Sequence, residues 1–326
     1  MPGLAEVLQG KGSHESVTLP AVRYRFHFRV TAPIHFPEYA GSMIRGAFGR
    51  ALRRTACMTR QSDCKACPLY RTCPYTAIFE TPPPEGAALQ KFSQIPNAYV
   101  IEPPVWGRHT FEIGEMVSFG IVLFGRAREQ LALVTYALQR AFSYDVGHGK
   151  ASLESVYRVN SDKDGRFEDM LIYTPSSEQI VPHSMTSTLT IPQAETVKIQ
   201  MLTPMRLQKN GVPLGPDRLT SRAFLMTLVR RVSLLSAYQN GEDLNLDTKA
   251  LSQESDAVCM DVDMGWKDWT RYSTRQKQTM SLGGVVGDLT LTNLTPTLRV
   301  FLAAGMLTHV GKNASFGMGR YILSVS

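Results

Sequence analysis

Apolar and polar residues alternate strictly near the beginning of the chain. One face of this segment consists of Val22, Tyr24, Phe26, Phe28 and Val30. The opposite face consists of Arg23, Arg25, His27 and Arg29. A period of two predicts a half-buried β-strand. Its cationic face is either a solvated surface or a sheet surface that contacts nucleic acid.

Apolar residues at helical spacing follow directly and predict a helix over 37–54, with Pro37 in its first turn. A second stripe along the same helix consists of Tyr39, Ser42, Gly46, Gly49, Arg50 and Arg53. Each glycine costs a helix about 1 kcal/mol relative to alanine. The two glycines therefore indicate either close approach of another backbone, from protein or RNA, or tight packing on a sheet.

The rest of the pattern repeats one plan twice. In the first copy, the strand at 22–30 and the helix at 37–54 are followed by predicted strands at 98–103 and 115–125, a helix at 127–142 and a strand at 151–159. This is the strand–helix–strand–strand–helix–strand order of a ferredoxin-like fold. The looser second copy has strands near 196–203, 263–270, 278–291 and 320–325 and helices near 217–238 and 296–308. The sequence thus predicts an α+β fold of tandem ferredoxin-like (RRM-like) domains. Their expected limits are 20–165 and 185–326, after a flexible leader at 1–19.

Composition adds a preference for a polyanionic partner, since the chain of 326 residues has a net charge of +7. No run of 18 apolar residues is present, which argues against a membrane-spanning helix. The first twenty residues lack the apolar core of a signal peptide, so we expect a cytoplasmic protein.

Four of the five cysteines lie close together, at Cys57, Cys64, Cys67 and Cys73. One C-x2-C pair with two flanking thiolates suits a tetrahedral zinc ion. An iron–sulfur cluster or no metal at all are the alternatives. A closed four-thiolate site leaves no position for substrate, so we expect structural zinc in a small knuckle over 57–73 and no catalytic metal.

A glycine-rich loop near the end of the chain separates a predicted helix from a predicted strand. It contains Gly311, Gly317 and Gly319, with Lys312 and Arg320 beside them. Successive amide groups in such a loop can bind phosphate oxygens, and glycine permits the positive φ angles that this needs. The alternative is a tight helix-to-strand turn.

Aromatic and basic residues also alternate within residues 266–277, where Trp266, Lys267, Trp269, Arg271, Tyr272, Arg275, Gln276 and Lys277 occur. Such a stretch suits stacking on unpaired bases together with phosphate contacts. The alternative is a strand with two buried tryptophans and a solvated basic edge.

Taken together, these segments resemble the CRISPR-associated pre-crRNA-processing endoribonucleases of the RAMP superfamily. The matching segments are 38–54, 67–75, 79–80, 125–127, 202–207, 269–276, 283–284 and 309–320. The resemblance implies metal-independent cleavage of a repeat transcript that leaves 2′,3′-cyclic phosphate and 5′-hydroxyl ends. It also implies a CRISPR repeat RNA stem-loop as partner, and other CRISPR effector subunits. Two residues depart from the family pattern: Asn313 replaces a common glycine, and Arg50 stands where relatives often carry histidine.

Cleavage by an internal 2′-hydroxyl needs proton transfer and stabilisation of phosphate charge. We expect His35 and Tyr39 to transfer protons and Arg50 and Arg53 to stabilise the phosphate. The predicted RNA contacts are Arg23, Arg25, His27, Arg45, Trp269, Arg271, Arg275, His309, Gly311, Lys312, Ser315, Gly317, Gly319 and Arg320. The alternatives are a non-catalytic RNA-binding subunit of a CRISPR effector complex, or an enzyme whose chemistry resides at the cysteines.

Overall fold

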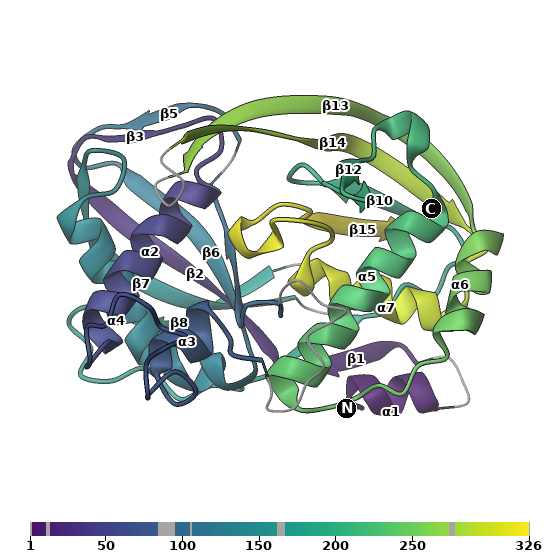
Figure 1. The fold of residues 1–326 in the computed structure, drawn as a ribbon, viewed down its shortest axis with the longest axis horizontal. Helices are drawn as coiled ribbons and strands as arrows, with labels where there is room; N and C mark the ends of the chain where they lie inside the picture. Colours follow the sequence, from purple (N-terminus) through teal and green to yellow (C-terminus); the bar gives the residue numbers. More distant parts are fainter. Residues whose placement is uncertain are drawn as a thin grey trace.

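The computed structural model describes residues 2–10, 14–83, 95–104, 106–161, 167–273 and 278–325. They form two halves, each a β-sheet with helices packed against it (Figure 1). The N-terminal half contains a five-stranded sheet in the order β4-β6-β2-β7-β8. Its strands are β2 (Ala21–Ala32), β4 (Tyr99–Glu102), β6 (Met116–Phe124), β7 (Lys150–Ser161) and β8 (Phe167–Tyr173).

Helices α2 (Gly41–Ala56) and α4 (Leu131–Tyr144) lie side by side against this sheet, and the short α3 (Pro74–Phe79) packs on α2. The apolar face of β2 confirms the alternating pattern, because all five of its predicted core residues are at most 1% exposed. Gly49 of α2 faces the ring of Phe79, which a Cβ at that position would overlap. This glycine therefore serves packing within the protein.

The C-terminal half contains a four-stranded sheet in the order β13-β14-β10-β15. Its strands are β10 (Val197–Met201), β13 (Cys259–Ser273), β14 (Gln278–Thr292) and β15 (Tyr321–Val325). Its helices are α5 (Ser221–Leu235), α6 (Thr248–Ala257) and α7 (Pro296–Thr308), and β11 (Gln208–Lys209) and β12 (Val212–Pro213) form a small hairpin. The predicted limits of α7 are confirmed, since Thr295 caps the helix and Pro296 opens it.

The two sheets share one order of strands. In each half the first strand lies between the third and the fourth, and the second lies beyond the third. Neighbouring strands in both sheets are antiparallel. The protein is therefore a mixed α/β fold of antiparallel sheets, and none of its described helices is both long and apolar enough to cross a bilayer.

The hairpin of β13 and β14 extends across the top of the molecule toward the N-terminal half (Figure 1). There Trp269 packs against Tyr39 and Trp106, with ring centroids 5.7 Å and 5.0 Å apart. The neighbouring hairpin consists of β3 (Ile34–Phe36) and β5 (His109–Phe111). The contact connects the two halves on one side of the molecule.

The segment before residue 20 corrects the prediction of a flexible leader. It contains α1 (Leu4–Gln9) and β1 (Ser16–Leu19), and β1 pairs with β9 (Ser187–Thr190). Its apolar side chains are buried in the core of the C-terminal half: Leu4, Val7, Val17 and Leu19. Burial of these side chains orders the segment, because each removes apolar surface from water.

Candidate active site between the two halves

The glycine-rich loop between α7 and β15 is held tightly against the N-terminal half. Gly311, Gly317 and Gly319 have φ angles of 87°, 99° and 72°, in the region that favours glycine. A Cβ at Gly317 would lie 2.5 Å from the carbonyl oxygen of Ile101 and 2.9 Å from the hydroxyl of Tyr39. The glycines therefore allow close approach of protein backbone and side chains at this point.

Hydrogen bonds fix the inner edge of the loop. The Tyr39 hydroxyl donates to the carbonyl of Phe316 at 2.9 Å, and the Thr203 hydroxyl donates to the carbonyl of Gly317 at 2.7 Å. The amides of Lys312 and Gly319 donate to carbonyls of the segment after β10, each at 2.9 Å. The Lys312 side chain is exposed and Ser315 is half-buried, so these two present the outer edge.

A buried ionic cluster sits beneath the loop. Glu102, at the end of β4, is 2% exposed and accepts from Arg23 of β2, whose Nε lies 3.1 Å and Nη2 3.0 Å from its Oε1. The same oxygen lies 3.2 Å from Nε2 of His309 and 3.5 Å from Nε of Arg320. Since His309 and Arg320 flank the glycine-rich loop, one carboxylate of the N-terminal half binds both ends of a loop from the other half.

The charges of this cluster determine its protonation. Burial opposes ionisation of Glu102, but Arg23 and Arg320 outweigh it and hold the pKa of this carboxyl well below its usual range. Burial lowers the pKa of His309, partly opposed by Glu102. Burial also raises the pKa of Tyr39 well above its usual value. At neutral pH the cluster therefore holds an ionised Glu102, and Tyr39 keeps its proton.

The cationic face of β2 is paired with carboxylates. Besides the pair of Arg23 with Glu102, Arg25 pairs with Asp169 and Arg29 pairs with Glu154. His27 shares a hydrogen bond of 2.6 Å with the Ser118 hydroxyl. These carboxylates offset the positive charge that the sequence offers to RNA, so this face is not an open cationic surface.

The four predicted catalytic residues do not converge on one point. Tyr39 lies at the loop, and His35 is exposed on β3, where its Nδ1 is 3.1 Å from the Thr110 hydroxyl. Arg53 donates to backbone carbonyls of the cysteine segment, at 2.5 Å and 2.9 Å. Arg50 is exposed on α2. At a helical rise of 1.5 Å per residue it lies about 13 Å along the helix axis from Gly41, the first residue of α2.

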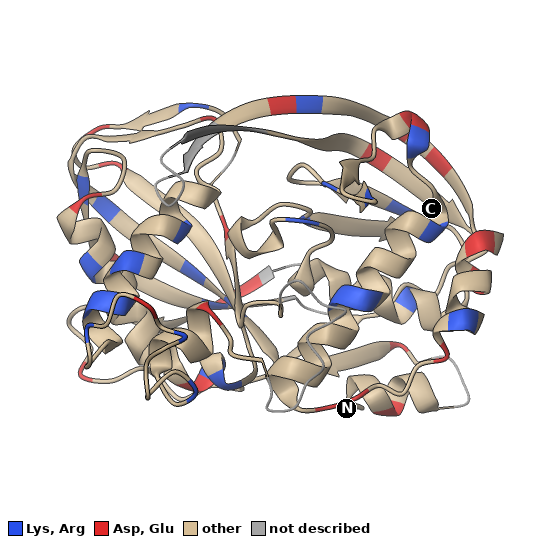
Figure 2. Ribbon diagram, viewed as in Figure 1, with Lys and Arg blue, Asp and Glu red and all other residues tan. Residues whose placement is uncertain are grey.

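The remaining predicted RNA contacts have mixed environments. Trp269 is 5% exposed within the aromatic contact described above, so a base could stack on it only after the hairpin moves. Arg45 is half-buried over the ring of Phe79, 4.5 Å from its centroid. Arg271 lies on β13, and Arg275 lies outside the described residues. Figure 2 shows positive residues along α2 and on the neighbouring α4.

Sequence reasoning missed three residues of this site. Glu102 holds the cluster together, Thr203 bonds the loop, and the indole of Trp106 donates to Glu38 at 3.1 Å. The available signal for Glu102 was a lone carboxylate at the end of the apolar run Tyr99–Glu102.

Two known family models match separate parts of the chain. A family model described as an N-terminal domain matches residues 19–185, slightly more than half of the chain. The model of the CRISPR-associated endoribonuclease Cas6 matches residues 199–321. The chain belongs to the family that the first model describes, and its later part is similar to Cas6. The candidate site forms between the two matched regions, since Tyr39 and Glu102 lie in the first and the glycine-rich loop lies in the second.

Solved structures show the same fold at low identity. A Cas6 product complex has a TM-score of 0.54 at 13% identity, covering 93% of this chain and 99% of that one. Thermus thermophilus Cas6 has a TM-score of 0.50 at 13% identity, covering 97% and 100%. A partial Cas6-RT-Cas1–Cas2 complex has a TM-score of 0.54 at 14% identity; the match covers 94% of this chain but only 46% of that longer chain. A search of curated proteins gave no match.

Proposed function

We propose that this protein is an endoribonuclease that cleaves CRISPR precursor transcripts within the repeat. The match of residues 199–321 to the Cas6 endoribonuclease model supports this proposal. The structural observation that carries it is the glycine-rich loop, fixed by Glu102 and Tyr39 on its inner edge and presenting Lys312 and Ser315 on its outer edge. The shared strand order of the two sheets further supports a tandem ferredoxin-like fold.

The inner edge of the loop adjoins the N-terminal end of α2, because Gly41 packs against the carbonyl of Phe316. The first turn of this 16-residue helix carries no acidic side chain. The positive end of the helix dipole therefore favours a phosphate beside the first turn of α2, and the exposed Lys312 ammonium offers a further positive charge at the outer edge of the loop. A repeat RNA that lies here would have its backbone oriented by a rigid surface, which suits recognition by shape and phosphates.

The reaction we propose is attack of a 2′-hydroxyl on the adjacent phosphorus, with a 2′,3′-cyclic phosphate and a 5′-hydroxyl as products. The substrate itself holds the nucleophile in place, so positioning and charge stabilisation supply much of the catalysis. His35 is an exposed imidazole near α2 and is our candidate for proton transfer. Exposed Arg50 is the candidate for contacting phosphate, whereas the hydrogen bonds of Tyr39 and Arg53 support positioning roles for them, at the loop and at the cysteine segment.

The test is incubation of the purified protein with labelled CRISPR repeat RNAs in EDTA, including the repeat from its own locus, followed by analysis of the product ends. We expect one cut with a cyclic phosphate end. His35→Ala should slow single-turnover cleavage, whereas His109→Ala, on the paired strand β5, serves as the matched control. Tight binding without a cut would instead make the protein an RNA-binding subunit. If the protein neither binds nor cuts the repeat RNA, the proposed function is refuted.

A further inference from the structure

The segment that connects α2 to α3 is irregular, although it lies against the core. Between Cys57 and Cys73 the chain consists of turns and bends without a helix or strand. It offers few apolar side chains for packing, and its Met58 is 75% exposed. A connection of this length without secondary structure is uncommon, and small units without a core usually need a covalent or metal staple.

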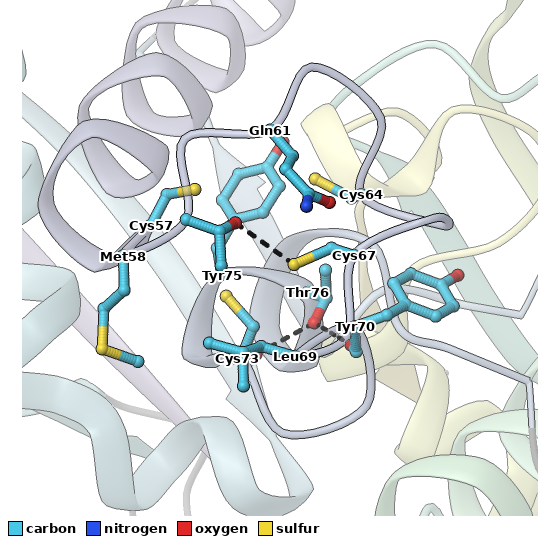
Figure 3. A pocket seen from close by; sticks show the side chains of 11 residues that line it. Cys57, Met58, Gln61, Cys64, Cys67, Leu69, Tyr70, Cys73, Tyr75 and Thr76 are labelled. Carbon is cyan, nitrogen blue, oxygen red and sulfur yellow. Dashed lines mark hydrogen bonds between the residues drawn. The ribbon is translucent and has the colours of Figure 1, made fainter.

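Its four cysteines surround one small pocket. Cys57, Cys64, Cys67 and Cys73 all line this pocket, and all four are free thiols. Figure 3 shows their sulfur atoms directed inward from different parts of the loop. Cys64 and Cys67 lie on one turn, because the amide of Cys67 donates to the carbonyl of Cys64 at 3.2 Å. A C-x2-C turn with two further thiols is the usual donor set of a structural zinc site.

Groups that support thiolates surround the pocket. The amide of Arg60 donates to Sγ of Cys57 at 3.3 Å, and the Thr59 hydroxyl lies 3.2 Å from Sγ of Cys67. The guanidinium of Arg53 is held beside the loop by the carbonyls of residues 61 and 62. Hydrogen bonds to sulfur and a neighbouring cation both stabilise a site whose four thiolates and zinc ion carry a net negative charge.

From these observations we propose that Cys57, Cys64, Cys67 and Cys73 bind one zinc ion and form a structural zinc knuckle. The pocket lining contains no histidine or carboxylate, and an all-sulfur donor set selects zinc or an iron–sulfur cluster over harder ions. Within the described chain no three His, Cys, Asp or Glu side chains are already arranged to hold an ion. Binding must therefore draw the thiols toward their common centre, to about 2.3 Å from zinc.

The site would join the ends of two helices. Cys57 is the C-cap of α2, and Cys73 is the N-cap of α3. A zinc ion bound to both fixes where α2 ends and α3 begins, and it thereby supports the packing of Gly49 against Phe79. This proposal does not depend on nuclease activity, since it concerns only the metal content and the stability of the fold.

The experiment is metal analysis of the untagged, full-length protein after dialysis against a chelating resin. We expect one zinc per chain, released in one equivalent when a mercurial reagent blocks the thiols. Replacement by cobalt should give intense sulfur-to-cobalt charge-transfer bands of a four-thiolate site. Cys67→Ser should abolish stoichiometric zinc, whereas Cys259→Ser should retain it, because Cys259 is exposed and remote from the pocket.

Three results would overturn the proposal. The first is wild-type protein without zinc, and the second is iron with acid-labile sulfide in its place. The third is full zinc content in the Cys67→Ser variant. If that variant fails to fold, the mercurial release and cobalt spectrum of the wild-type protein decide the question alone.

Discussion

Replacement of Glu102 by glutamine tests the buried cluster that fixes the glycine-rich loop. Glu102→Gln keeps the shape of the side chain and one carbonyl acceptor but removes the negative charge. Arg23, which is 8% exposed, then loses this counter-ion, and Arg320 and His309 lose the negative charge that draws them together. The change affects both halves of the protein, because β4 carries the carboxylate and the loop carries two of its partners.

The expected loss follows from burial. Removing one partner of a buried ion pair costs about 3–5 kcal/mol, because the other charge is left uncompensated. The amide oxygen of glutamine still accepts a hydrogen bond, so we expect a loss of about 3 kcal/mol. In a protein of this size that lowers the midpoint of thermal unfolding by roughly 4 °C.

The assay is thermal and urea unfolding at pH 7 beside a matched control. Glu154→Gln breaks the pair of Glu154 with Arg29, whose side chains are 41% and 44% exposed. An exposed pair of this kind contributes about 0–1 kcal/mol. Equal unfolding midpoints for Glu102→Gln and Glu154→Gln would refute the view that the buried cluster holds the two halves together.

The same cluster predicts a dependence on pH. The folded state depresses the pKa of Glu102, so its contribution is present above the unfolded value of about 4.3 and is lost as the pH falls below it. The pKa of His309 is also lowered, so the unfolded chain binds a proton below about pH 6.5 that the folded state refuses. Both groups make wild-type stability fall from pH 7 toward pH 4. The difference between wild type and Glu102→Gln should shrink below about pH 4.3, and a constant difference in urea midpoints would contradict this.

Three further predictions concern the loop itself. Tyr39→Phe keeps the ring but leaves a buried carbonyl without its donor, so the urea midpoint should report a loss of about 1–3 kcal/mol, and an unchanged midpoint would count against the bond. Gly319→Ala adds a Cβ that overlaps the carbonyl of Val310 at a φ of 72°, and it should destabilise more than Gly211→Ala, which has a φ of 82° but open space. Lys312→Ala should weaken RNA binding and reduce the salt slope by about 1 without changing the unfolding midpoint, and an unchanged slope would remove this lysine from the phosphate contacts.

Elements with a strong local pattern could be predicted from the sequence. The alternation of β2 and the helical limits of α7 are encoded by neighbouring residues, and both predictions are confirmed. The pairing of β1 with β9 was missed because the two strands are short and far apart in the chain: Ser16, for example, pairs with Thr190. No local pattern tells a four-residue segment which distant strand it will meet.

The candidate site was only partly predictable for the same reason. The glycine-rich loop is visible in the sequence, but the contact that fixes it is not, since Glu102 and His309 are separated by 207 positions. From the sequence, the arginines of β2 could form an RNA-binding surface. In the structure each of them pairs with a carboxylate. Which cation remains exposed depends on tertiary pairing.

Cleavage of a repeat RNA that carries a single 2′-deoxynucleotide tests the proposed chemistry most directly. The substitution is placed immediately 5′ of the mapped cut, and binding and single-turnover cleavage are measured in EDTA beside the all-ribose RNA. We predict that binding is retained and that cleavage at this position is abolished, because the nucleophile is missing. Cleavage of the deoxy substrate at the same bond would contradict the account, since another nucleophile would then be at work.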